Sequence, residues 1–123
     1  MHRYFSAFVL TVVAQPLWAA PQTMACTFVT ECYQDQGCDS TAYDVSFARN
    51  TNIDPVWTMS DVSGDRTAHV SMAGETETTL VQAEGPSAAH LMMLGPDGAA
   101  RYVVMIFEDP QIITYHGTCE GFE

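Results

Sequence analysis

Short segments in which apolar and polar residues alternate recur along this chain, and turn residues separate them about every 8–12 residues. Residues 41–48 are typical, because Tyr43, Val45 and Phe47 recur there with the two-residue period of a half-buried strand. Residues 95–98 are Gly-Pro-Asp-Gly, in which proline suits the second position of a turn and the last glycine can adopt a positive φ. Convincing helical periodicity is lacking after residue 20. The chain is therefore predicted to be all-β, a single small antiparallel meander that closes as a sandwich or a barrel.

The alternation predicts a succession of strands separated by turns. Strands are expected at 27–30, 41–48, 56–62, 67–72, 78–83, 88–94, 101–107 and 111–118, and turns at 49–54, 63–65, 74–75, 84–87, 95–98 and 108–110. Two stretches, 91–94 and 102–107, are apolar on both faces, which indicates burial on both sides. Cover of the outer face by another part of the same chain, with residues 56–59 as a candidate, is the more economical interpretation, and a partner subunit is the alternative.

The first twenty residues have the layout of a secretory signal peptide. A basic start with Arg3 precedes an apolar run at 4–14, and a Gln-Pro break and small residues follow. The run is too short to span the apolar core of a bilayer, which takes about 20 helical residues. We therefore expect a cleaved signal helix at 1–19, cut after Ala19, and a single β domain at 20–123.

This signal predicts a bacterial protein that matures in the periplasm or outside the cell, with no membrane span in the mature chain. Retention of the segment as a membrane anchor is an alternative. Lipid attachment at Cys26 is another, although the Thr-Met-Ala that precedes it is a poor lipobox. A mature chain of about 100 residues buries a modest core, so covalent links would help to stabilise it.

Four cysteines in an exported chain predict two disulfides. The stretch from Cys26 to Cys32 reads as a strand and would separate them by about 20 Å, whereas a disulfide permits about 6 Å between Cα atoms. The polar segment between Cys32 and Cys38 contains Gly37 and can turn back. We therefore expect Cys32–Cys38 and Cys26–Cys119 bridges. Because Cys-x-x-Cys is lacking, neither a thioredoxin-like site nor a zinc ribbon is indicated.

The net charge is the most unusual feature of the composition. The sequence has 15 acidic residues against 4 arginines and no lysine, which gives a formal charge of −11. Such a chain lacks the positive footprint that nucleic-acid binding requires. The negative field would speed the capture of a basic partner protein, and solubility or a salty milieu explains it equally.

Histidine and methionine side chains are the candidates for metal binding. His90 and Met92 lie two residues apart and so share a strand face, and His116 is a further candidate. Histidine with methionine suits copper, but methionine is also a common filler of protein cores. Ordinary packing is the favoured interpretation, and a metal or small-ligand carrier is the alternative.

Motifs of enzyme chemistry are lacking in the sequence. Neither Gly-x-Ser-x-Gly nor Ser-x-x-Lys occurs. Acidic residues flank or occupy predicted turns, and we interpret them as exposed turn acids: Asp61, Asp65, Glu108 and Asp109. The chain is therefore expected to be neither an enzyme nor the holder of a cofactor.

The spacing of Cys26, Cys32 and Cys38 and the ending Ile-Thr-Tyr-His-Gly-Thr-Cys-Glu at 113–120 resemble a group of small exported proteins of alphaproteobacteria that have no assigned activity. This resemblance implies export and a compact β fold. Size, export, disulfides and charge lead us to expect a small binding or interaction protein, for example an inhibitor or adaptor of a basic exported enzyme such as a lysozyme-type hydrolase.

Overall fold

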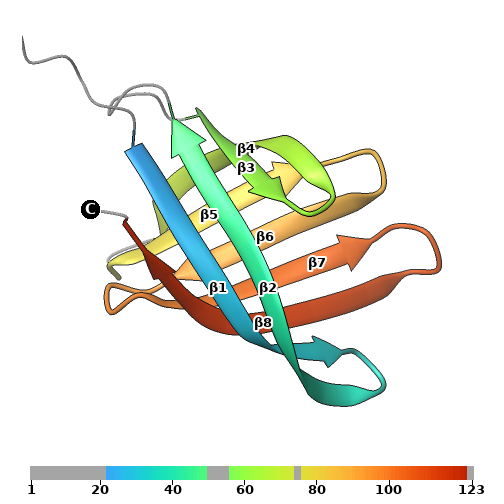
Figure 1. Ribbon diagram of the computed structural model, residues 1–123. Helices are drawn as coiled ribbons and strands as arrows, with labels where there is room; N and C mark the ends of the chain where they lie inside the picture. The colour runs from blue at the N-terminus through green and yellow to red at the C-terminus, as the bar shows by residue number, and fades with distance from the viewer. Residues whose placement is uncertain (1–21, 50–55, 74–75, 122–123) are drawn as a thin grey trace, which may run out of the picture.

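The computed structural model describes residues 22–49, 56–73 and 76–121. The strands are Gln22–Tyr33 (β1), Gly37–Arg49 (β2), Val56–Asp61 (β3), Gly64–Ala73 (β4), Thr78–Glu84 (β5), Ala88–Leu94 (β6), Ala99–Ile106 (β7) and Gln111–Glu120 (β8). Each strand pairs antiparallel with the next, and β8 pairs with β1, which closes a barrel (Figure 1). The predicted all-β meander is confirmed, and the barrel is the closure found. The signal peptide predicted at 1–19 lies outside the described residues, as do the turn at 74–75 and nearly all of the turn at 49–54.

The two ends of the barrel are built from different parts of the chain. The turns at 34–36, 62–63, 85–87 and 107–110 lie together at one end, to the right in Figure 1, which we call the hairpin end. The start of β1, the end of β8 and the turn at 95–98 lie at the opposite end, which we call the terminal end. No helix in the described ranges is long and apolar enough to cross a membrane.

The barrel interior follows the predicted alternation. Tyr43, Val45 and Phe47 of β2 point inward, as do Trp57 and Met59 of β3. An eight-stranded barrel is narrow enough for side chains alone to fill it, and buried apolar residues from all eight strands meet inside. Burial of each large side chain contributes about 2 kcal/mol, so this filling is the main source of stability.

Both predicted disulfides are present, and each joins residues that lie directly opposite each other on paired strands. Cys26 and Cys119 link β1 to β8 across a sequence separation of 93, and Cys32 and Cys38 link β1 to β2 across a separation of 6. The second bridge lies on the strands beside a tight turn rather than in the polar loop that the sequence suggested. The first bridge fixes the seam where the two ends of the sheet meet.

A glycine allows β1 and β8 to meet closely near the middle of this seam. A Cβ atom on Gly117 would lie 2.0 Å from the carbonyl oxygen of Thr27 and 2.6 Å from the Cα of Phe28, so a larger residue does not fit without backbone movement. The register of β1 also shifts between Phe28 and Thr30 on both of its sides: against β8 the extra residue is Val29, and against β2 the extra residue lies in β2 between Ser40 and Tyr43. Bulges bend strands and increase their twist, which is what closing this barrel requires.

The outer face of β6 to β8 carries exposed apolar side chains and is not covered by residues 56–59, so that prediction is wrong. The segment belongs to β3, where Trp57 and Met59 fill the interior. Met93, Met105 and Ile112 point outward and are 37–41% exposed. The two-faced apolar pattern of these strands therefore reflects a buried inner face and a largely open outer one.

Candidate functional site

The β3–β4 hairpin is paired with β5 only at its base, and its pairing with β2 covers only three residues, 58–60. Toward the hairpin end, the last backbone pair between β2 and β3 is Ser46 with Ser60. The last pair between β4 and β5 is Ala68 with Ala83. Beyond these pairs, residues 64–67 of β4 pair only with β3. A crevice of about 370 Å³ on the β2 side and a groove of about 470 Å³ on the β5 side flank the hairpin.

The carboxylate of Asp61 ties the tip of this hairpin to the barrel wall. Its Oδ2 accepts hydrogen bonds from the Tyr43 hydroxyl at 2.6 Å and from Arg66 Nη1 at 2.9 Å. Its Oδ1 accepts from the backbone N–H and the hydroxyl of Ser63, at 2.9 and 2.6 Å, and from Arg66 Nη2 at 3.3 Å. Because Tyr43 belongs to β2, these side-chain bonds continue the attachment where backbone pairing stops.

Asp61 is buried, so its interpretation as an exposed turn acid is wrong. Its side chain is 1% exposed and that of Arg66 is 13% exposed. Burial acts to raise the pKa of Asp61, but hydrogen bonds from Arg66, Ser63 and Tyr43 outweigh it and hold the pKa below its usual range. The signal was present in the alternation, because Asp61 continues the inward series of Trp57 and Met59.

Stacked aromatic rings fill the interior next to Asp61. The ring of Tyr43 stacks on Tyr115 with centroids 4.8 Å apart, Tyr102 lies 5.6 Å from Tyr115, and Phe28 lies 5.5 Å from Tyr102. Burial raises the pKa of all three tyrosines, that of Tyr115 to about 12. They are therefore neutral hydroxyl groups at physiological pH, and this part of the barrel is packed rather than hollow.

His90 lies beside this stack and is half-buried. Its Nδ1 lies 2.5 Å from the Tyr102 hydroxyl oxygen, and the two rings are stacked. Burial and the positive charge of Arg66 lower the pKa of His90, which keeps the imidazole neutral near pH 7. Every buried side-chain nitrogen and oxygen in the described ranges has a hydrogen-bond partner, so this interior polar cluster is satisfied by its own members.

The structure separates the three residues considered for metal binding. His90 and Met92 share the inner face, as expected, and the Met92 sulfur lies 3.9 Å from Cys26 Sγ in the core. His116 lies on the outer face, in register with Arg101 of β7. In the part of the chain that the structure describes, no cluster of three or more His, Cys, Asp or Glu side chains is arranged to hold a metal ion.

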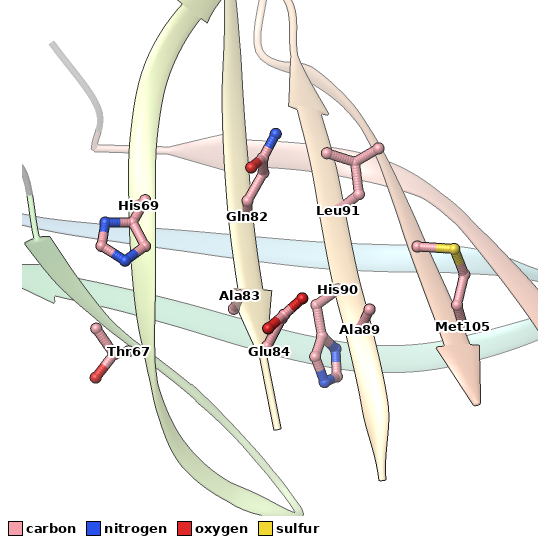
Figure 2. A pocket seen from close by; sticks show the side chains of 9 residues that line it. All are labelled: Thr67, His69, Gln82, Ala83, Glu84, Ala89, His90, Leu91 and Met105. Atoms are coloured by element: carbon pink, nitrogen blue, oxygen red, sulfur yellow. The ribbon is translucent and has the colours of Figure 1, made fainter. Parts of the chain in front are cut away.

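The groove on the β5 side joins the outer surface to the interior cluster. Figure 2 shows β4 curving away from β5 toward the hairpin end, with Glu84 and His90 near the bottom of the view. Leu91 and Met105 form an apolar wall, and inward-facing His90 also lines the groove. The groove therefore offers an apolar surface, the carboxylate of Glu84, the half-buried imidazole of His90 and the exposed imidazole of His69.

The hairpin end collects exposed carboxylates and exposed apolar tips. Each of its four turns contains or adjoins exposed acidic side chains, namely Asp35, Asp65, Glu84, Glu108 and Asp109. Val62 and Phe107, in two of these turns, are 89% and 55% exposed. Of the arginines in the described ranges, Arg66 is paired with Asp61, and Arg49 and Arg101 lie elsewhere on the barrel.

Comparisons of this chain with protein-family models, with curated proteins and with solved structures gave no match. Two disulfides in one small barrel are typical of proteins outside the cytoplasm.

Proposed function

We propose that the protein is a non-enzymatic binding protein that holds a basic partner protein at the hairpin end of its barrel. One observation carries this proposal: all four turns of the hairpin end present exposed carboxylates, and two of these turns also expose an apolar side chain, Val62 or Phe107. Protein interfaces combine apolar contacts with polar and charged surroundings, and this end offers both kinds of group. The packed interior supports a surface site, because its polar groups already satisfy one another.

The charges and the apolar tips would have different roles in binding. The carboxylates attract a positively charged surface over a distance and increase the association rate at low salt. The tips at Val62 and Phe107 lose water on contact, and their burial would slow dissociation. A partner that satisfies both needs basic residues together with apolar positions that these tips can contact.

A basic enzyme encountered after export fits these requirements. We infer that residues 1–19 direct the chain out of the cytoplasm and that the mature barrel acts as an inhibitor or adaptor of such an enzyme, for example a lysozyme-type hydrolase. Small size, two disulfides and a charge of −11 support this context.

The test measures binding of the oxidised protein to a basic lysozyme-type hydrolase by calorimetry. We expect binding at about 20 mM salt that is largely lost at about 0.5 M salt through screening. The variant Glu108→Gln/Asp109→Asn removes two charges at the hairpin end and should weaken binding at least about tenfold. Asparagine at 109 tolerates the positive φ of that residue.

The matched control is Glu77→Gln/Glu120→Gln, which removes the same charge at the terminal end. It should change the affinity by less than about threefold, because exposed charges separated by more than a Debye length interact weakly. Equal weakening by both double variants would mean that only net charge matters and would overturn the proposed site. Absence of binding at low salt would overturn the proposed function for this class of partner.

A further inference from the structure

The groove beside β4 exposes a stretch of strand with one unused edge. Residues 64–67 pair with β3 on one side, whereas pairing with β5 ends at Ala68 and Ala83. Strand edges of this kind accept an additional extended segment through backbone hydrogen bonds. The groove of about 470 Å³ reaches this edge at Thr67 (Figure 2), so an extended peptide that lies in the groove can continue along the edge.

The side chains that line the groove specify what such a segment should carry. Leu91 and Met105 point outward from β6 and β7 and supply an apolar wall. Glu84 ends β5 at the hairpin end of the groove, and its side chain is exposed. The guanidinium of Arg66 is held by Asp61, and Glu84 is the one carboxylate among the lining residues, so the groove carries a negative charge when His69 and His90 are neutral.

We propose that this groove receives an extended segment in which an apolar side chain lies next to a lysine or arginine. The apolar side chain packs on Leu91 and Met105, the cation pairs with Glu84, and the backbone adds to the free edge of β4 at 64–67. The proposal rests on the proposed function, since it names the part of a basic partner that this end of the barrel recognises. His90 also lines the groove, and its Nδ1 is already engaged by the Tyr102 hydroxyl.

The experiment titrates three blocked peptides into the oxidised, isotope-labelled protein and follows amide shifts by NMR. The peptides are Gly-Leu-Lys-Leu-Gly, Gly-Leu-Gln-Leu-Gly and Gly-Ser-Lys-Ser-Gly. We expect the first to shift the amides of Arg66, Thr67 and Glu84, and each of the others to bind at least about fivefold more weakly, as for one exposed ion pair or one small apolar contact. Shifts confined to the turns at 34–36 and 107–110, or no shifts with any peptide at millimolar concentration, would overturn the groove as a peptide site.

Variants of the protein separate the groove from general charge attraction. Glu84→Gln should weaken the lysine peptide about fivefold and leave the glutamine peptide unchanged. Glu77→Gln, with the same change of charge at the terminal end, should leave both unchanged. Equal effects of the two variants on the lysine peptide would overturn the assignment of the cation to Glu84.

The failure of this inference can be told apart from the failure of the proposed function. If Glu84→Gln and Leu91→Ser leave binding of the basic hydrolase unchanged while Glu108→Gln/Asp109→Asn weakens it, the groove proposal fails and the function stands. If the lysine peptide binds in the groove but the hydrolase does not bind at all, the groove stands and that partner class fails.

Discussion

The two halves of the barrel interior differ in composition although the same eight strands build both. Toward the terminal end the buried side chains are apolar, with Met24, Phe47, Trp57 and Leu94 among them, and Thr79 is the buried polar residue found there. Toward the hairpin end the interior contains three stacked tyrosines, an aspartate–arginine pair and a histidine.

This difference follows the continuity of the sheet. In the terminal half each strand is paired with both of its neighbours, and the Cys26–Cys119 disulfide joins β1 to β8. In the hairpin half, pairing stops on both sides of the β3–β4 hairpin, at Ser46 with Ser60 and at Ala68 with Ala83. Directional side-chain bonds from Asp61 replace the missing ladder there. Buried polar groups are therefore found in the half of the barrel where their hydrogen bonds hold the hairpin in place beyond the end of the backbone pairing.

The largest expected effect tests the terminal half. Replacing both Cys26 and Cys119 by alanine should lower the free energy of unfolding by about 4–5 kcal/mol, because the bridge closes a loop of 93 residues in the unfolded chain. The corresponding Cys32→Ala/Cys38→Ala variant should lose about 2 kcal/mol, since its loop spans only 6. Urea unfolding followed by circular dichroism measures both, and a greater loss in the second variant would contradict the role given to the barrel seam.

The next effect tests the hairpin half. Asp61→Asn should destabilise the barrel by about 3 kcal/mol, because it leaves the guanidinium of Arg66 buried without its counter-charge. The double variant Asp61→Asn/Arg66→Met should lose less than the single one, since the uncompensated charge is gone. The exposed Asp65→Asn is the control and should stay within about 0.5 kcal/mol of the parent. Equal losses in the single and double variants would show that the ion pair is not what holds the hairpin.

The sequence predicted the strands well because alternation and turn residues are local signals. It left the choice between sandwich and barrel open, since alternation does not determine which distant strands pair. The predicted bridge between Cys26 and Cys119 already placed the first strand beside the last, which is the closure that the structure shows. The bulge at Val29 and the close approach at Gly117 depend on strands far apart in sequence and had no local signal.

The interior polar cluster was missed because turn acids are usually exposed. Extending the inward series by one step, from Met59 to Asp61, would have placed the carboxylate inside. Arg66 could be found in the same way, because it precedes the inward Ala68 by two residues. The opening of the sheet on both sides of the hairpin depends on register, which the sequence pattern does not show.

A smaller expected effect is a difference between the two halves in how stability depends on pH. Burial and Arg66 hold the pKa of His90 below its ordinary value of 6.5, so the unfolded chain binds this proton more readily than the barrel does. The contribution of His90 to stability is complete above about pH 6.5 and is lost as the pH falls toward the folded pKa. Urea unfolding at about pH 7.5 and 5.5 should therefore show lower stability at the lower pH.

The variant His90→Gln should reduce this pH dependence, whereas His116→Gln, on the outer face, should retain the part due to His90. A second loss follows at lower pH from Asp61, whose pKa in the barrel lies below its usual 3.8. Stability from Asp61 is present above that value and disappears as the pH falls below it. If the His90→Gln variant lost as much stability as the parent between about pH 7.5 and pH 5.5, this loss would have a cause outside the hairpin half.

The smallest expected effect concerns backbone strain in the charged turns of the hairpin end. Asp109 has a φ of 46°, the one positive value at a non-glycine residue in the described ranges. Asp109→Gly should stabilise the barrel by up to about 1 kcal/mol, because glycine adopts this conformation without a steric penalty. Asp35→Gly removes the same charge from another turn of this end, where φ is not positive, and should instead cost up to about 1 kcal/mol through unfolded-state entropy. Opposite signs in urea unfolding would locate the strain in one turn, whereas equal shifts would assign both effects to reduced charge repulsion at the hairpin end.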